Sequence, residues 1–330
     1  MSKQLFVTTP IYYVNGSPHL GHAYTTMAAD VIARFYRLDG YDVLFLTGTD
    51  EHGQKVERSA LAAGLTPQEY VDQVSQTFRS LKEPLNLSYD QFIRTTAPRH
   101  KKAAQHLWKS IEANGFIYKS VYAGWYATRD EAYYQESELV EGKAPTGSPV
   151  EWVEEPSYFF KLSAFQEPLS KFYKEHPDAI GPTTRFNEVV RFIEGGLQDL
   201  SISRSTFKWG IPVPGDPDHV MYVWMDALTN YITALGYPDQ DISKYWSHSL
   251  HLLGKDILRF HAVYWPAFLM AAGLTPPRRI FSHGWWICKG EKMSKSIGNV
   301  VDPMTIVNRY GSDQLRYFFI REVPFGKDGD

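Results

Sequence analysis

Residues 5–22 have the sequence LFVTTPIYYVNGSPHLGH. The first four residues are a short, mostly apolar run, which is typical of a strand buried in a parallel sheet. The loop that follows is rich in turn formers, and Ser17 before Pro18 predicts a helix start with Ser17 as its cap. The stretch therefore predicts a strand, a loop and a helix in succession.

The next residues complete a β-α-β unit. Apolar side chains at helical spacing predict one buried helix face, formed by Ala23, Met27, Val31, Phe35 and Leu38. Gly40 predicts the end of the helix, and residues 43–46 predict a second strand that leads into the loop 48–53, GTDEHG. Open α/β sheets bind ligands beyond the carboxyl ends of their strands, so we expect both loops to border a site.

Composition sets broad limits on what the chain does. It has 330 residues, 43% of them hydrophobic, and a net charge of −3, which excludes an overall basic field for nucleic acid. A basic patch at Arg99, Lys101 and Lys102 is more simply a solvated helix start. The single cysteine, Cys288, excludes an internal disulfide, and the longest apolar stretch, residues 262–274, is too short to span a bilayer. These features predict a cytoplasmic protein without membrane segments.

The chain changes character twice along its length. From about residue 116 to residue 217, short aromatic segments, turns and acidic residues replace helical periodicity, which predicts an inserted α+β domain. The α/β pattern then resumes, with a helix over 221–235, a strand over 251–254, a helix over 257–272 and a strand over 280–283. We predict a Rossmann-like doubly wound parallel sheet in two halves, 1–115 and 218–287, split by the insertion 116–217 and followed by a terminal region, 288–330.

His19-Leu20-Gly21-His22 is the first motif with chemical meaning. Two imidazoles three residues apart share one helix face, beside the N–H groups and the positive dipole end that bind anions. Gly21 removes a side chain, so that a flat base or ribose can approach the backbone. Taken alone, two histidines near a helix start are more often polar surface.

Lys292-Met293-Ser294-Lys295-Ser296 is the second motif, and glycines at 290 and 298 flank it. Two lysines in such a loop can neutralise the charge that builds on a leaving pyrophosphate. A lysine-rich loop is usually plain surface, but this string arises by chance in a chain of this length about once in ten thousand.

Together the two motifs resemble the signatures of the class I aminoacyl-tRNA synthetases. The first signature, HIGH, appears with Leu20 in place of Ile, and the second, KMSKS, is unchanged. Three further segments resemble the methionine-specific branch: residues 10–18 (PIYYVNGSP), residues 223–231 (VWMDALTNY), and Gly254-Lys255-Asp256-Ile257 continuing to Trp265. The resemblance implies a ligase of protein biosynthesis. It would join methionine to ATP, release pyrophosphate and pass the methionyl group to the 3′-terminal adenosine of tRNA(Met).

The resemblance also implies a set of site residues. The methionine side chain would be lined by Ile11, Tyr13, Trp224, Ala227, Leu228, Tyr231, Ile257, His261 and Trp265, and Asp50 would bind the α-ammonium group. ATP would be bound by His19, Gly21, His22, Gly254, Asp256, Lys292, Ser294 and Lys295. Catalysis would fall to Lys295, Lys292, His19 and His22, with Mg²⁺ on the pyrophosphate, and Arg204 is a further candidate for the reacting carboxylate or phosphate. Taken without the resemblance, the tryptophans and Tyr231 fit core packing, and Asp50 fits a turn.

Two departures from the family pattern stand out. Many members carry zinc ligands in the insertion, but here Ala127, Asp130, Ala144 and Thr146 occupy the expected positions. One aspartate cannot complete a tetrahedral site, so we expect no zinc. Family members also continue into an anticodon-reading helical bundle, which we expect to be missing after residues 316–319. We further expect a monomer.

Three other functions are compatible with parts of the pattern. The isoleucyl, valyl and leucyl enzymes share both signatures but carry a much larger editing insertion than this chain has room for. A small nucleotidyltransferase is expected to lack the second signature and the insertion. A non-catalytic RNA-binding relative is expected to have lost a signature lysine or histidine, and this chain has lost none.

Overall fold

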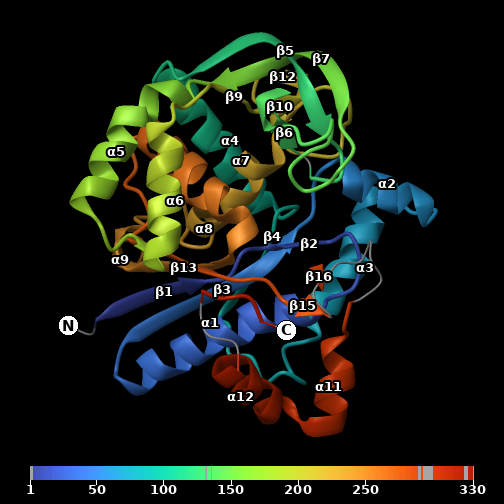
Figure 1. Cartoon of the computed structure of the whole chain (residues 1–330), viewed down its shortest axis with the longest axis vertical. Helices are drawn as coiled ribbons and strands as arrows, with labels where there is room; N and C mark the ends of the chain where they lie inside the picture. The colour runs from blue at the N-terminus through green and yellow to red at the C-terminus, as the bar shows by residue number, and fades with distance from the viewer. Residues whose placement is uncertain are drawn as a thin grey trace.

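The computed structural model describes residues 3–130, 132–134, 136–288, 291–292, 300–322 and 326–329. Its centre is a 7-stranded parallel sheet (Figure 1). The strands are β1 (Gln4–Thr8), β2 (Tyr12–Tyr13), β3 (Asp42–Asp50), β4 (Gln91–Arg94), β8 (Ile180–Gly181), β13 (Ser249–Gly254) and β14 (Arg279–His283). Strands β3, β1, β13, β14 and β8 lie side by side in that order, and β2 and β4 also pair with β3. The predicted parallel sheet is confirmed, and its two halves meet where β1 pairs with β13.

The sheet is buried on both faces. Phe6, Leu46 and Leu253 belong to one core cluster, whereas their chain neighbours Val7, Phe45 and Leu252 belong to another. Successive side chains of a strand point to opposite faces, so these assignments place one cluster on each side of the sheet. A core on both sides is what a doubly wound sheet requires.

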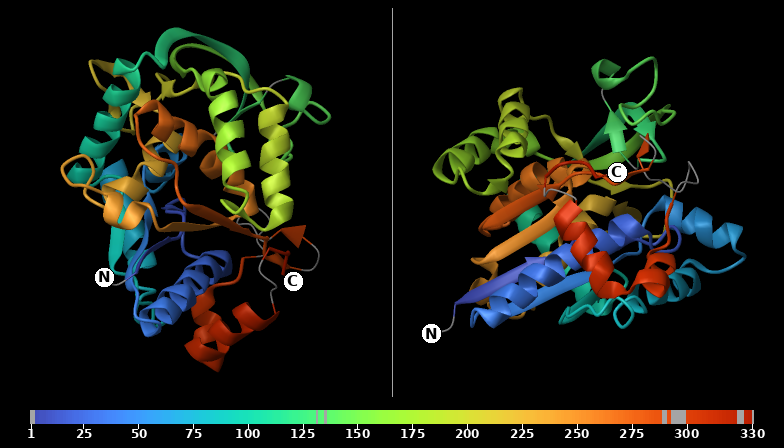
Figure 2. Two further views of the ribbon diagram at one scale, coloured as in Figure 1. Left: turned by 90° about the vertical axis from the view of Figure 1, so that its left-hand side faces the viewer. Right: turned by 60° about the horizontal axis from the view of Figure 1, so that its bottom comes forward.

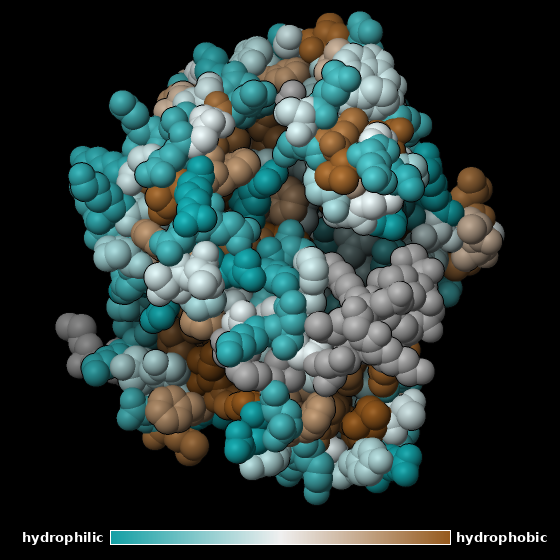
Figure 3. Space-filling view, viewed as in Figure 1, coloured by the Kyte–Doolittle hydropathy of each residue, from teal (hydrophilic) through white to brown (hydrophobic). Residues whose placement is uncertain are grey.

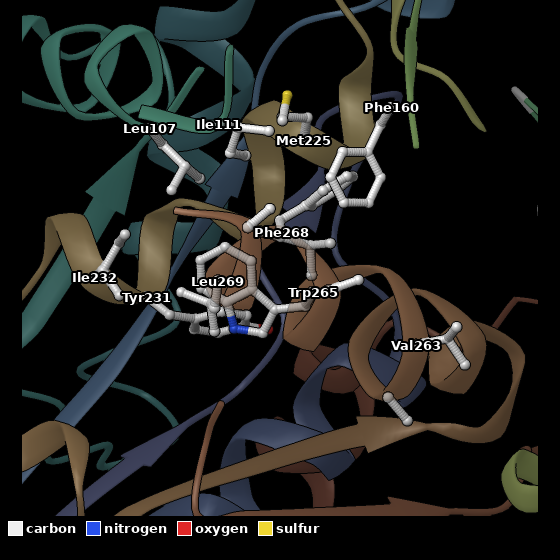
Figure 4. Packing of buried hydrophobic residues seen from close by; sticks show 14 of the residues in the cluster. Leu107, Ile111, Phe160, Met225, Tyr231, Ile232, Val263, Trp265, Phe268 and Leu269 are labelled. Carbon is white, nitrogen blue, oxygen red and sulfur yellow. The ribbon is translucent and has the colours of Figure 1, made fainter. Parts of the chain in front are cut away.

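Helices from distant parts of the chain cover the two faces (Figure 2). One core contains residues of α4 (Pro98–Ala113), α7 (Val223–Leu228), α8 (Asn230–Thr233) and α10 (Trp265–Ala271), as Figure 4 shows for Leu107, Tyr231 and Trp265. The other core contains residues of α1 (Leu20–Leu38) and α12 (Ser312–Glu322), with α11 (Pro303–Tyr310) beside them. The remaining α-helices outside the insertion are α2 (Gln54–Ala62), α3 (Pro67–Arg79) and α9 (Ser243–Trp246). Within the described ranges, no helix is long and apolar enough to cross a membrane.

Helix α1 differs from its prediction at both ends. Its cap is His19, not Ser17, because the imidazole of His19 accepts the hydrogen bond that a serine oxygen was expected to accept. Phe35 and Leu38 were expected to be buried, yet they are 62% and 89% exposed. The buried stripe instead continues through Asp30, which is fully buried and holds Arg316 of α12. The predicted stop is confirmed, since Gly40 follows the cap Asp39 with φ +81°.

Residues 116–217 form mainly antiparallel structure. One sheet contains β5 (Ile117–Ala127), β6 (Ala132–Tyr134), β7 (Glu151–Phe160) and β9 (Leu200–Ser201). A second contains β10 (Ser203–Arg204), β11 (Pro212–Val213) and β12 (Asp216–Met221), and the stretch also holds α5 (Gln166–Glu175) and α6 (Thr183–Glu194). Strand β8 lies in the same stretch of chain but pairs with β14 in the parallel sheet. The predicted domain boundaries remain a prediction.

The two helices predicted after the insertion are interrupted. Residues 221–235 contain the end of β12 and then α7 and α8, while residues 257–272 contain a π-helical turn over Phe260–Tyr264 before α10. Pro266 has no N–H, so it cannot bond the carbonyl of Ala262 as an α-helical residue would. The hydroxyl of Tyr173 in α5 donates to that carbonyl at 2.5 Å instead. The π-turn is thus stabilised from outside the helix, and it carries His261.

Candidate active site

Three of the predicted site residues, His19, Asp50 and Asp256, lie at or just after the carboxyl ends of β2, β3 and β13. Viewed as in Figure 1, the molecular surface is hollowed below the antiparallel insertion (Figure 3). The loops that follow the parallel strands position Asp50, His19 and Asp256 at one edge of the sheet. This is the edge at which open α/β sheets bind ligands.

His19 and His22 cap the helix that carries them. The backbone N–H of His19 donates to Nδ1 of His22 at 3.0 Å, and the N–H of Gly21 donates to Nδ1 of His19 at 3.2 Å. The rings stack with centroids 3.6 Å apart. Because both Nδ1 atoms accept hydrogen bonds, each neutral ring carries its proton on Nε2, the nitrogen suited to donate to an anionic oxygen. The pair is therefore set in one tautomer beside the positive end of the α1 dipole.

Gly21 has a local reason to be glycine. A Cβ atom at this position would lie 3.1 Å from Cε1 and Nδ1 of His19, closer than ordinary van der Waals contact. The position thus makes room for the His19 ring, a requirement that the sequence alone did not reveal. Its predicted contact with ATP remains a prediction.

The loop after β3 is fixed by buried hydrogen bonds. The Glu51 carboxylate is fully buried and accepts from Thr49 and from Arg94, each at 2.7 Å, and also from Thr96. The backbone N–H of Glu51 donates to the hydroxyl of Thr95 at 2.9 Å. Asp50, the last residue of β3, is 7% exposed and directly precedes this anchor. The candidate ammonium ligand is therefore held on rigid backbone.

Trp209, near the end of the insertion, forms two hydrogen bonds with the loop that follows β3. Its indole N–H donates to the carbonyl of Glu51 at 2.6 Å, and its own carbonyl accepts from the N–H of Gly53 at 3.0 Å. Its ring also meets the edge of the His52 ring at 5.4 Å. The insertion thus returns to the sheet directly at the site, which sequence analysis missed because a lone tryptophan gives no such signal.

The predicted methionine pocket is an aromatic cluster around a neutral histidine. The hydroxyl of Tyr231 lies 2.7 Å from Nε2 of His261, and Nδ1 of His261 lies 2.9 Å from the carbonyl of Ile257. Burial lowers the pKa of His261 to about 4, so the ring is neutral near pH 7. A neutral ring can satisfy both contacts only if Nδ1 donates to the Ile257 carbonyl and Nε2 accepts from Tyr231.

Other predicted pocket residues surround this pair. Trp224 meets the His261 ring at 6.1 Å and stacks on Phe260 at 3.8 Å, and Trp265 lies 6.3 Å from Tyr231. Four more predicted pocket residues belong to or pack against the same hydrophobic core: Ile11, Tyr13, Leu228 and Ile257. The remaining one, Ala227, is buried on α7. The structure therefore brings Tyr231, His261, Trp224 and Trp265 together in one aromatic cluster, while the pocket as a whole and its contact with methionine remain a prediction.

Gly254 and Asp256 lie at the end of β13. A Cβ atom at Gly254 would lie 2.7 Å from the Asp256 carboxylate, so the glycine allows the carboxylate to approach the backbone. Beside them, His283 of β14 accepts from the hydroxyl of Thr25 at 2.8 Å and donates to the carbonyl of Gly284. Burial lowers the pKa of His283. Since Thr25 lies on α1, this contact ties the first signature helix to the end of β14.

The second signature lies mostly outside the described residues. The backbone of Lys292 belongs to β16 (Glu291–Lys292), which pairs with β15 (Ile287–Cys288). The side chain of Lys292 and all of Ser294 and Lys295 fall outside the described part of the chain, so their predicted roles remain predictions.

Arg204 lies inside the insertion. It is 3% exposed, donates to the carbonyl of Ser203 at 2.6 Å and to the hydroxyl of Ser201 at 3.0 Å, and lies over the Tyr222 ring at 4.7 Å. These contacts give the guanidinium a packed structural environment. A contact with the substrate carboxylate remains a prediction.

Asp130 and Thr146, two of the four positions expected for zinc ligands, belong to a hydrogen-bonded cluster of hydroxyl groups around the Asp130 carboxylate. Asp130 accepts from Ser148 at 2.7 Å, from Tyr134 at 3.1 Å and from Thr146. Ala127 and Ala144 are buried, and their side chains carry no atom that could bind a metal. Across the residues that the structure describes, no three His, Cys, Asp or Glu side chains are placed to hold a metal. One carboxylate among neutral hydroxyls does not fit zinc.

Comparison with known proteins agrees with this geometry. A family model described as tRNA synthetases class I (M) matches residues 5–151 and 138–330. The chain belongs to this family of class I tRNA synthetases.

Individual relatives point to one amino acid. The chain is 58% identical over 333 residues to a methionine–tRNA ligase of Rickettsia bellii, a match that covers 100% of this chain and 65% of the relative. It is 59% identical to a methionine–tRNA ligase of Mesorhizobium japonicum, over 99% of this chain and 64% of that protein. A Mycobacterium tuberculosis methionyl-tRNA synthetase solved with methionyl-adenylate superposes with a TM-score of 0.96 at 56% identity, over 99% of this chain and 66% of that one. The chain thus spans about two thirds of the length of these relatives.

Proposed function

We propose that this chain activates methionine with ATP and is the catalytic portion of a methionine–tRNA ligase. The observation that carries the proposal is the neutral Tyr231–His261 pair in an aromatic cluster, on the same sheet edge as an anion-binding helix start. A thioether is polarizable and gains from aromatic neighbours, so the cluster suits a methionine side chain. The relatives named methionine–tRNA ligase support the same substrate.

The mechanism follows from positioning and charge. A carboxylate oxygen of methionine attacks the α-phosphorus of ATP in line, a new P–O bond forms, and the bond to pyrophosphate breaks. Asp50 would hold the α-ammonium group, while the Nε2–H groups of His19 and His22 donate to phosphate oxygens. Lys295 and Lys292 would stabilise the leaving pyrophosphate, and Mg²⁺, when bound with ATP, would supply further positive charge.

No covalent enzyme intermediate is needed, and the product is methionyl-adenylate. The 2′-hydroxyl of the terminal adenosine of tRNA(Met) would then attack the carbonyl carbon of the adenylate, forming an ester with the methionyl group as the bond to AMP breaks and AMP leaves with the hydroxyl proton. We propose the acceptor end of that tRNA as the partner, a cytoplasmic location typical of such enzymes, and a monomer.

Methionine-dependent exchange of labelled pyrophosphate into ATP tests the proposal. We expect exchange with methionine and only background without an amino acid. An Asp50→Asn variant, which keeps the shape of the side chain but loses its charge, should have a raised KM for methionine. Exchange driven by isoleucine or valine, or independent of any amino acid, would contradict the proposed function.

A further inference from the structure

A buried bridge links two parts of the site that are far apart in the sequence. Nδ1 of His52 lies 2.6 Å from one carboxylate oxygen of Asp226, and Nε2 of His100 lies 2.7 Å from the other. The side chains of His52, Asp226 and His100 are 3%, 1% and 0% exposed. The bridge connects the loop after β3, helix α7 and helix α4.

Each end of the bridge belongs to a different part of the proposed substrate site. His52 follows Asp50 by two residues, and its carbonyl accepts from the hydroxyl of Tyr13 at 3.1 Å. Asp226 lies between Trp224 and Ala227 on the short helix α7. The bridge therefore joins the candidate ammonium ligand to the helix that lines the candidate side-chain pocket.

The carboxylate of Asp226 is ionised in this bridge. A ring nitrogen that faces an ionised carboxylate donates to it, so Nδ1 of His52 and Nε2 of His100 both donate to Asp226. The hydroxyl of Thr233 lies 3.2 Å from the other ring nitrogen of His100, Nδ1, and adds a further contact with α8. Burial alone raises the pKa of Asp226, yet attraction to His52 and hydrogen bonds from both rings lower it to about 2.

We propose that Asp226 is a positioning residue that, through His52 and His100, fixes the distance between the ammonium-binding carboxylate and the methionine side-chain pocket. The proposal rests on the proposed function, and it concerns how the site binds the ammonium group and the side chain of one methionine at the same time. A ligand that contacts both Asp50 and the side-chain pocket needs the two at a fixed distance, whereas a ligand that contacts only the pocket does not.

Two ligands separate these cases. L-Methioninol carries both the ammonium group and the thioether side chain, whereas 3-(methylthio)propan-1-ol carries the thioether without the ammonium group. We expect Asp226→Asn to weaken L-methioninol binding about tenfold relative to the native chain while binding of the thioether alcohol changes less than about twofold. Titration calorimetry or competition in the exchange assay gives both dissociation constants.

Matched variants separate positioning from general destabilisation. Asp30→Asn removes another fully buried carboxylate, which holds Arg34, Ser88 and Arg316, and should leave the ratio of the two dissociation constants native. His100→Gln keeps a donor near the position of Nε2, so its ratio of the two dissociation constants should stay close to native. His100→Leu removes that donor, so its ratio should change as it does in Asp226→Asn. If Asp226→Asn does not fold, the two His100 variants provide the test.

Equal weakening of both ligands by Asp226→Asn or His100→Leu, or no weakening of either, would overturn the proposal. A native chain that fails to exchange pyrophosphate with methionine would instead overturn the proposed function, so the two failures are distinct.

Discussion

The two halves of the candidate site are built by opposite physical means. In the side-chain pocket, Tyr231 and His261 are each 1% exposed, and burial keeps the imidazole neutral. At the start of α1, His19 and His22 are only half-buried and lie beside the positive end of a helix dipole. In the proposed function, one half would recognise an apolar side chain by removing water and charge, and the other would bind phosphates by concentrating positive potential.

The comparison teaches where mutations should act. Interactions with the pocket exist before and after the reaction, so their loss should weaken methionine binding. Charge on the leaving pyrophosphate grows only as the reaction proceeds, so losses on the phosphate side should lower the rate.

The largest expected effect is on the phosphate side. Lys295→Ala should raise the adenylation barrier by about 2–4 kcal/mol and leave methionine affinity nearly intact. Single-turnover formation of methionyl-adenylate, measured across methionine concentrations, separates the two quantities. A loss of methionine affinity as large as the loss of adenylation rate would contradict the assignment of separate roles to the pocket and to the phosphate side.

Acid should destabilise the folded chain partly through the pocket histidine His261. The pKa of His261 falls from 6.5 to about 4 in the folded chain, so the unfolded chain binds more protons between these values. The contribution of the neutral His261 ring to the free energy of unfolding is fully present above pH 6.5. It is lost as the pH falls toward 4, which lowers the free energy of unfolding by ~3 kcal/mol. Burial lowers the pKa of His251 in the same direction. Urea unfolding at pH 7 and pH 4.5 should show a smaller loss for His261→Gln than for the native chain, and equal losses would argue against a neutral buried ring.

The hydroxyl of Tyr231 should matter for affinity. Tyr231→Phe removes the donor to Nε2 of His261 and leaves that buried acceptor unsatisfied, at a cost of about 1–2 kcal/mol. Because the acceptor is unsatisfied in both the free and the bound chain, this cost lowers the free energy of unfolding. We expect the KM for methionine to rise because the His261 ring is no longer oriented by Tyr231, while kcat for exchange stays close to native. A fall in kcat at unchanged KM would place Tyr231 on the phosphate side instead.

The smallest effect is expected at the tip of the insertion. Asp130→Asn should alter the hydrogen bonds that Tyr134 and Ser148 make to this side chain. The exchange rate should stay within about twofold of native, because these contacts are local to the insertion. Metal analysis of the native chain should find no stoichiometric zinc. One tightly bound zinc per chain, resistant to chelation, would contradict the expectation that this chain has no zinc site.

Charging of tRNA extends the comparison beyond adenylation. This chain should form methionyl-adenylate yet charge tRNA poorly and with little regard to the anticodon, because residues 1–330 match only 65% of the length of the methionine–tRNA ligase of Rickettsia bellii. Aminoacylation of tRNA(Met) and of an anticodon variant measures this. Efficient charging that drops when the anticodon changes would place anticodon recognition within residues 1–330.

Sequence patterns predicted the parts of the molecule that depend on local order. The apolar runs predicted the central parallel strands, and Gly40 predicted the end of α1. The rule that Ser or Thr caps helices failed at Ser17, because an imidazole took the role of the hydroxyl. The expected long helix over 257–272 is interrupted by a π-helical turn, and the hydroxyl of Tyr173, a residue remote in sequence, donates to the carbonyl of Ala262 in that turn.

The gathering of the pocket residues was predictable only through the family resemblance, and the bridge was not predictable at all. His52, His100 and Asp226 have no spacing that marks them as partners, since 174 and 126 residues separate the bonded pairs. Glu51 and Trp209 were missed for the same reason: their roles depend on which backbone passes beside them in the folded chain.

The pyrophosphate-exchange rates of methionine, norleucine, leucine and isoleucine on the native chain test the central claim most directly. Norleucine keeps the length of methionine and loses only the polarizable sulfur, whereas a misplaced methyl group in leucine costs roughly 1–3 kcal/mol. We predict kcat/KM to fall in the order methionine, norleucine, then leucine and isoleucine. Leucine or isoleucine ahead of methionine would contradict the substrate assignment, and norleucine far behind leucine would contradict the aromatic pocket built around Tyr231 and His261.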